Sequence, residues 1–149
     1  MKRPLLKRSV TVAVAASAFG LMLANPALAS SQRCAQAATG PSGLDTIQVC
    51  IEWGVDGFAD AQTSYFTSTA LSSRHIYIGD SFSGPFTGSP SYIGADAVVA
   101  PGSVLRTNSD VQADPAGSQA WAAVGTVYAG SGGPITFQLR LPSSGYLAF

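Results

Sequence analysis

Residues 30–149 contain no lysine, a single histidine and a single glutamate. The four arginines of this region are its only permanent cations, and they are scattered, whereas nucleic-acid binding requires clustered cations that contact phosphates. A histidine-based zinc site is also excluded, because such a site takes three or four protein ligands. No phosphate-binding loop or dinucleotide fingerprint is present, so no cofactor is expected.

Residues 1–29 have the pattern of a secretory signal peptide. Four basic residues lie within the first eight positions, and an uncharged run rich in Val, Ala and Leu follows over residues 10–24. An Ala-x-Ala cleavage site ends at Ala29. The run of 15 residues is shorter than the roughly 20 that span a bilayer, so no membrane attachment is expected after cleavage. The sequence therefore predicts one secreted domain, residues 30–149, and the alanine-rich signal is typical of bacteria.

Cys34 and Cys50 are the only cysteines of the chain. An even number of cysteines in an exported protein predicts a disulfide, and two cysteines allow a single intramolecular pairing. The bridge would close a loop of 15 intervening residues and stabilise the fold by about 3 kcal/mol. Because there is no C-x-x-C motif and no histidine nearby, we expect a structural bridge rather than a redox or metal site.

Apolar and polar residues alternate along several segments, which is the period of a half-buried strand. The two clearest apolar faces comprise Ile47, Val49, Ile51 and Trp53, and then Ile135, Phe137, Leu139 and Leu141. About seven such segments are separated by turns rich in Gly, Pro and Ser. They predict an all-β fold, a small antiparallel β-sandwich that is immunoglobulin-like or related, with a barrel as the alternative. In general pattern the chain resembles small exported single-sandwich proteins of bacteria, a likeness that assigns no residue a role.

Two local predictions concern the middle of the chain. Residues 61–71 and 74–78 both have strand character, and we expect them to pair as a hairpin. Residues 79–94 contain Gly or Pro at six positions, so we expect a long surface loop or short edge strands there.

Four aromatic residues are candidates for ligand binding: Phe82, Phe86, Tyr92 and Trp121. The first three lie in the Gly- and Pro-rich segment, and exposed aromatic rings on a loop bind apolar molecules or sugar faces. The alternative is that these rings pack the loop against the core. Trp53 shares its face with apolar neighbours, so we expect it in the core.

The catalytic inventory is weak. His75 is the one histidine available to a Ser-His-Asp triad, but there is no G-x-S-x-G motif, and we expect an ordinary histidine beside Tyr77. Glu52 with Asp56 or Asp60 would supply a glycosidase carboxylate pair, although such pairs are common by chance. No catalytic residue is assigned.

Calcium is the best metal candidate, because hard oxygen ligands on loops suit this ion. The weak candidates are Asp56, Asp60, Asp110 and Asp114, with Asn108 beside the last two. Solvated turn residues explain these acids more simply, so no metal site is expected.

Three functions remain open. The leading hypothesis is a small secreted non-enzymatic domain with a binding or cell-surface structural role, whose partner is an extracellular protein or a polysaccharide. The second is a secreted inhibitor of proteases or other enzymes that acts through residues 79–94. The third is a small hydrolase that uses His75.

Overall fold

The computed structural model describes residues 31–53, 57–84, 89–113, 120–141 and 147–148. These residues form ten β-strands and one short 3-10 turn. The strands are β1 (Ser31–Thr39), β2 (Asp45–Trp53), β3 (Phe58–Phe66), β4 (Arg74–Ser83), β5 (Ser91–Val99), β6 (Val104–Arg106), β7 (Asp110–Ala113), β8 (Ala120–Tyr128), β9 (Ile135–Leu141) and β10 (Leu147–Ala148), and the turn is η2 (Pro41–Gly43). No helix in these ranges has the length and apolarity that a membrane crossing requires.

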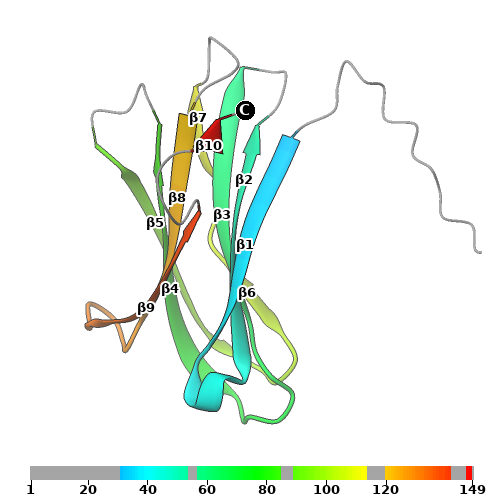
Figure 1. Cartoon of the computed structure of the whole chain (residues 1–149). Helices are drawn as coiled ribbons and strands as arrows, with labels where there is room; N and C mark the ends of the chain where they lie inside the picture. Colours follow the sequence, from blue (N-terminus) through cyan, green and yellow to red (C-terminus); the bar gives the residue numbers. More distant parts are fainter. Residues whose placement is uncertain (1–30, 54–56, 85–88, 114–119, 142–146, 149) are drawn as a thin grey trace, which may run out of the picture.

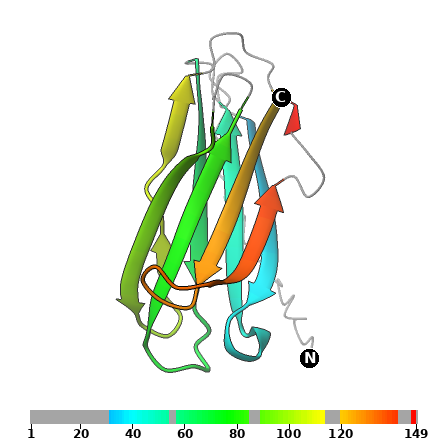
Figure 2. The same cartoon turned by 90° about the vertical axis from the view of Figure 1, so that its left-hand side faces the viewer.

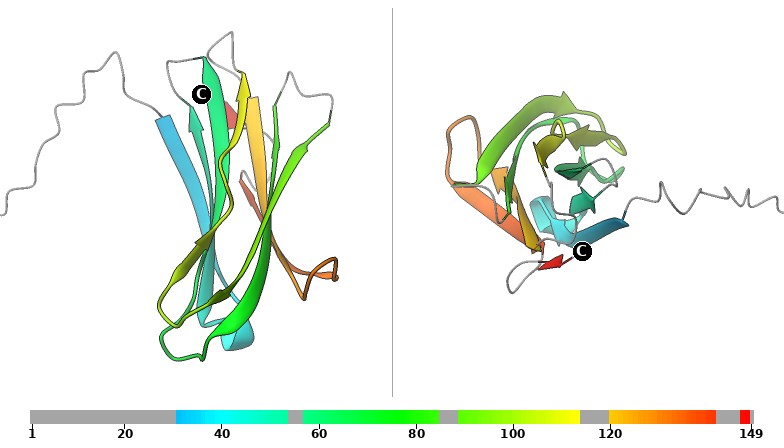
Figure 3. Two further views of the ribbon diagram at one scale, coloured as in Figure 1. Left: turned by 180° about the vertical axis from the view of Figure 1, so that it is seen from behind. Right: turned by 90° about the horizontal axis from the view of Figure 1, so that it is seen from above.

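Two antiparallel sheets pack face to face (Figure 1). In the first sheet the order is β1-β2-β3, and β6 and β7 follow one another along the remaining side of β3. In the second sheet the order is β5-β4-β8, and β9 and β10 both pair with β8. Seen from above, the strands surround a shared interior (Figure 3). The sheets are not closed on each other, which confirms the sandwich and not the barrel. The described residues contain ten strands rather than the predicted seven, and two strands share one side of β3 and two share one side of β8.

The alternation in β2 has the predicted consequence. Ile47, Val49 and Ile51 are fully buried between the sheets, while the residues between them lie on the outer face. Cys34 and Cys50 are directly opposite each other in the β1–β2 register. They form the predicted disulfide, with Cα atoms 4.1 Å apart, and it ties the edge strand β1 to its neighbour.

The core between the sheets has two apolar clusters. One contains Phe82 and Trp121, whose rings stack with centroids 4.9 Å apart. The other contains Tyr65, Ile76 and Ile78. Trp53 is only partly buried and packs against the edge of the first cluster, so it covers the core rather than filling it.

A polar bridge crosses the middle of this core. The Thr63 hydroxyl on β3 donates a 2.6 Å hydrogen bond to Asp80 Oδ1 on β4, and both residues are fully buried. Asp80 Oδ2 finds no hydrogen-bond partner among the described residues. Burial raises the pKa of Asp80 to about 6, the Thr63 hydrogen bond lowers it, and the charge of Asp110 raises it. A carboxylic acid thus stands among apolar side chains at the centre of the sandwich.

One local prediction is wrong and the other holds in part. β3 and β4 do not form a hairpin, because residues 67–73 carry the chain from the first sheet to the second. Of the two alternatives for residues 79–94, the long loop is wrong, because residues 79–83 belong to β4 and residues 91–94 to β5, and these segments pair with each other. The edge-strand alternative is confirmed for residues 91–94, because β5 is an edge strand of the second sheet, although at nine residues it is not short. Gly79 and Gly94 in these strands allow the Tyr92 side chain to lie close to the sheet.

Candidate binding groove

The outer face of the second sheet carries a groove between rows of side chains, and Figure 2 looks onto this face. Directly opposite residues on antiparallel strands share a face, so the strand register defines these rows. In order, the rows across β5, β4 and β8 are Asp96–Tyr77–Tyr128, Gly94–Gly79–Thr126 and Tyr92–Ser81–Val124. The middle row has two glycines, and it therefore forms a trough between two rows that carry tyrosines.

The Tyr92 ring lies across this trough. A Cβ atom added to Gly79 would fall 2.6 Å from ring atoms of Tyr92, and one added to Gly94 would fall 3.4 Å from its hydroxyl. Tyr92 is nevertheless 58% exposed. One side of the ring is therefore against the glycine backbone while much of the residue remains open to solvent, which is the arrangement of a stacking platform.

The hydroxyl of Tyr92 interacts with that of Tyr128, which also lines the groove. Partial burial raises the pKa of Tyr92 to about 12, and a hydrogen bond with Tyr128 and the charge of that phenol act in the same direction. Tyr92 is therefore protonated over the whole physiological pH range. Its interaction with Tyr128 ties together the two tyrosine rows.

On the other side of the trough, Tyr77 is held by the neighbouring histidine. The rings of His75 and Tyr77 stack with centroids 4.3 Å apart and planes inclined by 10°. His75 Nε2 is 2.8 Å from Asp96 Oδ2, and Asp96 lies beside Tyr77 in the register. The Asp96 carboxylate is well exposed, so it can accept hydrogen bonds from a ligand as well as from His75.

The groove has a volume of about 400 Å³. Its sides are Tyr77, Tyr92 and Tyr128, and the β8–β9 turn at residues 130–132 borders one end. This volume is in the range of small-molecule sites. Ring faces, phenol hydroxyls and one carboxylate together suit a ligand that has both flat apolar faces and hydroxyl groups.

The structure separates the four predicted ligand-binding aromatics. Tyr92 is exposed and lines the groove. Phe82 and Trp121 are fully buried and stacked on one another, so they have no surface to offer a ligand. They face inward because side chains alternate along a strand, and the residues on either side of each ring point to the outer face. Phe86 lies outside the described residues.

The calcium candidates do not come together. Asp60 is opposite Val111 and Asp110 is opposite Ala61, so the two carboxylates lie on opposite faces of the first sheet. Asp110 faces inward and accepts a hydrogen bond from Ser91. Asp56 and Asp114 lie outside the described residues, and within the part of the chain that the structure describes there is no cluster of three or more metal-ligating side chains.

For each of the two catalytic hypotheses, the described residues contain only part of the required active site. His75 and Asp96 form the histidine–carboxylate half of a triad, but among the described residues no serine hydroxyl is hydrogen-bonded to His75. Glu52 and Asp60 are directly opposite each other on the outer face of the first sheet. The groove lies on the other sheet, so this carboxylate pair is not part of it.

Three groove residues were not predicted from the sequence: Tyr77, Tyr128 and Asp96. A signal was present, since Tyr77 alternates with the inward Ile76 and Ile78 and so had to face outward. The partner strands were the missing information, because the register alone brings Asp96 and Tyr128 beside it.

Comparison with protein-family models, curated proteins and solved structures finds no match to this chain. The fold itself defines the class: a two-sheet antiparallel β-sandwich with one disulfide. A disulfide in a small all-β domain is compatible with an extracellular location.

Proposed function

We propose that this protein is a secreted, non-enzymatic domain that binds a neutral polysaccharide in the groove on the outer face of the second sheet. The observation that carries the proposal is the Tyr92 ring, which lies on the Gly79–Gly94 trough and keeps a large exposed surface. An aromatic ring held in place presents a flat apolar surface, on which the C–H face of a sugar ring stacks at little entropic cost.

The polar groups of the groove favour a hydroxyl-rich ligand over a proline-rich peptide, the other common ligand of aromatic grooves. Asp96 is an acceptor only, and sugar hydroxyls supply donors to it. A proline-rich segment lacks many of its backbone N–H groups and offers carbonyl oxygens instead, which a carboxylate repels.

The charge balance favours a neutral rather than an acidic polysaccharide. Residues 30–149 carry four arginines against eight acidic residues, so their net charge is 4 − 8 = −4. None of the residues that line the groove is a lysine or an arginine. An anionic polymer would meet an unfavourable potential here.

The test is depletion of the purified residues 30–149 from solution by cellulose, chitin or starch granules. We expect at least one of these to adsorb the protein, and Tyr92→Ala to weaken adsorption by tenfold or more, because stacking surface is lost. Phe58→Ala is the matched control, since Phe58 is an exposed aromatic residue on the first sheet.

Two results would overturn the proposal: equal adsorption of the Tyr92→Ala and unchanged proteins, or adsorption to none of the polysaccharides. Hydrolysis of any of them that is abolished by His75→Ala would replace it with the hydrolase hypothesis. The inhibitor hypothesis stays a prediction, with residues 79–83 and 91–94 of its segment in paired strands.

A further inference from the structure

In the part of the chain that the structure describes, most edges of the two sheets carry a feature that hinders pairing with a further strand. Natural edge strands are protected by inward-pointing charges, by bulges, or by being very short. On β1, Arg33 lies directly opposite the buried Ile51 and therefore on the inward face. β6, β7 and β10 have two to four residues each, and the β8–β9 register is irregular between Val127 and Tyr128.

β5 has none of these features. It is nine residues long, contains no lysine or proline, and pairs with β4 in an unbroken register. Its inward residues, which lie opposite the inward residues of β4, are all uncharged. The side of β5 away from β4, its free edge, pairs with no strand among the described residues. A long edge without protection is a template on which another strand can add.

The two most exposed large apolar side chains of the described residues both lie on β5. Val98 is 69% exposed and Tyr92 is 58% exposed. Both are on the outer face, and each is three positions from Ala95, the middle residue of the strand. The apolar surface of β5 is therefore distributed symmetrically about its centre.

This symmetry fits a second copy of the same strand. If two β5 strands run antiparallel about a two-fold axis at Ala95, all nine residues have partners, and Tyr92 of each copy lies directly opposite Val98 of the other. An aromatic residue opposite a β-branched one is a favourable cross-strand pair. We propose that the protein dimerises by pairing β5 with β5 of a second copy, which joins the two second sheets into one continuous sheet.

Asp96 selects this register. It is the only charged residue of β5, and its side chain is 60% exposed. With the axis at Ala95, each Asp96 lies opposite Gly94 of the other copy, which has no side chain to oppose it. An axis at Asp96 would place two carboxylates directly opposite each other, which is unfavourable. An axis at Gly94 would leave Val98 without a partner, and a shift by one residue would pair inward with outward side chains.

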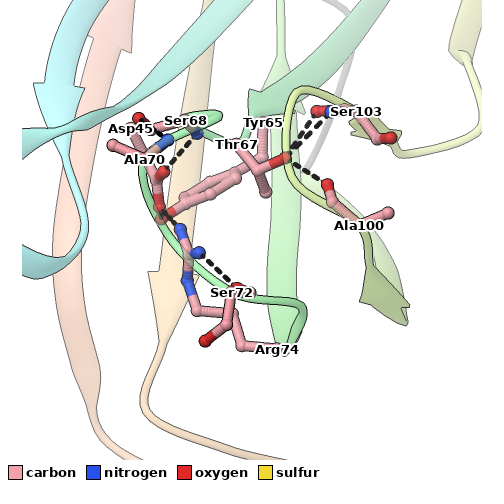
Figure 4. Close-up of polar contacts among 9 residues, drawn as sticks. All are labelled: Asp45, Tyr65, Thr67, Ser68, Ala70, Ser72, Arg74, Ala100 and Ser103. Carbon is pink, nitrogen blue, oxygen red and sulfur yellow. Dashed lines mark hydrogen bonds and ion pairs between the residues drawn. The ribbon is translucent and has the colours of Figure 1, made fainter.

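Both ends of β5 are already held in place in the single chain. At its C-terminal end, the Thr67 hydroxyl donates to the Ala100 carbonyl oxygen at 2.7 Å and accepts from the Ser103 N–H at 3.0 Å, so the turn after β5 is fixed to the residue that follows β3 (Figure 4). At its N-terminal end, Gln112 Nε2 on β7 donates to the Ser91 hydroxyl at 2.6 Å. A strand that is ordered in advance loses little conformational entropy when it pairs.

The dimer places both binding grooves on the same side of the joined sheet, because the two-fold axis is perpendicular to the sheet. A polymer long enough to reach both grooves would bind with an avidity that one groove does not have. The pairing of β5 does not depend on the proposed polysaccharide binding, and it is tested without polysaccharide.

The first test is sedimentation equilibrium of residues 30–149 over a range of concentrations. We expect a mass twice that of the single chain, and Val98→Lys should weaken dimerisation at least tenfold, because lysine protects edge strands. Val98 is exposed and does not line the groove, so the variant should keep its fold and its groove. Val111→Lys is the matched control, since Val111 is 55% exposed on the edge strand β7 of the first sheet.

Three outcomes would overturn the proposal. The first is a single-chain mass at every concentration up to about 1 mM. The second is equal weakening of the dimer by the two lysine variants, and the third is a dimer that only Val111→Lys dissociates.

The second test examines the register with Ala95→Cys. The two Ala95 residues lie directly opposite each other, where Cα atoms are about 4.5–5.5 Å apart, a separation that a disulfide spans. Ala97→Cys is the control on the same face, because Ala97 lies opposite Ile93 of the other copy and far from the other Ala97. On mild oxidation, Ala95→Cys should form a covalent dimer at least tenfold faster, as measured by non-reducing electrophoresis. Equal rates, or no covalent dimer from Ala95→Cys, would contradict the proposed pairing.

Discussion

Thr63 and Asp80 join the two sheets through the centre of the core by a single hydrogen bond of 2.6 Å. The bond satisfies one carboxyl oxygen, while the other has no partner among the described residues. Below its pKa of about 6 the carboxyl is neutral and tolerates burial, and above it a charge must be held in apolar surroundings.

This arrangement predicts a pH-dependent stability. The pKa of Asp80 is raised from 3.8 to about 6 in the folded chain, so between these values the folded state holds a proton that the unfolded state has released. The contribution of Asp80 to the free energy of unfolding is therefore fully present below pH 3.8. It falls as pH rises through this window and is lower by up to ~3 kcal/mol above pH 6.

Asp80→Asn should remove this loss, because the amide stays neutral and still accepts from Thr63. We expect the variant to be more stable than the unchanged protein by about 1–3 kcal/mol at pH 7.5 and similar to it near pH 4, measured by denaturant unfolding. Thr63→Val is the control and should destabilise more at pH 7.5. An Asp80→Asn variant that is destabilised equally at both pH values would contradict the prediction.

The glycine trough predicts unequal effects of two neighbouring substitutions. Gly79→Ala places a Cβ atom 2.6 Å from the Tyr92 ring and should displace it, whereas the Cβ of Gly94→Ala makes ordinary contact at 3.4 Å. A displaced Tyr92 should titrate closer to 10 than to 12 in an ultraviolet pH titration, and polysaccharide adsorption should weaken in parallel. Equal tyrosine titration curves for the two variants would show that the trough does not position Tyr92.

The stacked pair in the core predicts a loss of stability without a direct loss of binding. Phe82→Ala removes a fully buried ring that stacks on Trp121 and should lower the free energy of unfolding by about 3–5 kcal/mol. Adsorption to polysaccharide, measured where the variant is still folded, should be unchanged. A large loss of adsorption by folded Phe82→Ala would instead support the earlier expectation that Phe82 contacts the ligand.

The disulfide of the first sheet predicts a loss of stability without a direct loss of binding. Replacement of both Cys34 and Cys50 by alanine should lower the free energy of unfolding by about 2–4 kcal/mol, because the closed loop restricts the unfolded chain. The groove lies on the other sheet, so adsorption should persist in the folded variant. The intact mass of the unchanged protein should rise by two hydrogens on reduction, and an unshifted mass would show that the bridge is absent.

The alternation of side chains was enough to predict the strands that dominate the core. Ile47, Val49 and Ile51 are inward in β2, and Phe137, Leu139 and Leu141 face the core in β9 to different extents. The cysteine pairing also followed from the sequence, because two cysteines allow one intramolecular bridge. These features depend on local period or on simple counting.

The groove could not be predicted in the same way. In the sequence, Gly79 and Gly94 cannot be distinguished from glycines in turns. Only their pairing across β4 and β5 shows that they make room for the Tyr92 ring. Trp121 was a candidate for ligand binding, yet its ring is fully buried in a core cluster that also contains the small residues Ala59, Ala61 and Ala123. Pairing between distant segments decides both cases, and a single sequence does not contain it.

The order of pairing in the two sheets also has a kinetic consequence. β1, β2 and β3 pair with their neighbours in the chain, as do β4 with β5 and β8 with β9. The β4–β8 pairing is different, because it joins Tyr77 to Tyr128 across a long stretch of chain, as the pairings of β6 and β7 with β3 also do. Closing such a stretch is entropically costly and slows folding. We therefore expect the local hairpins to form early and both sheets to be completed late, so that the groove exists only once a slow step of folding is over.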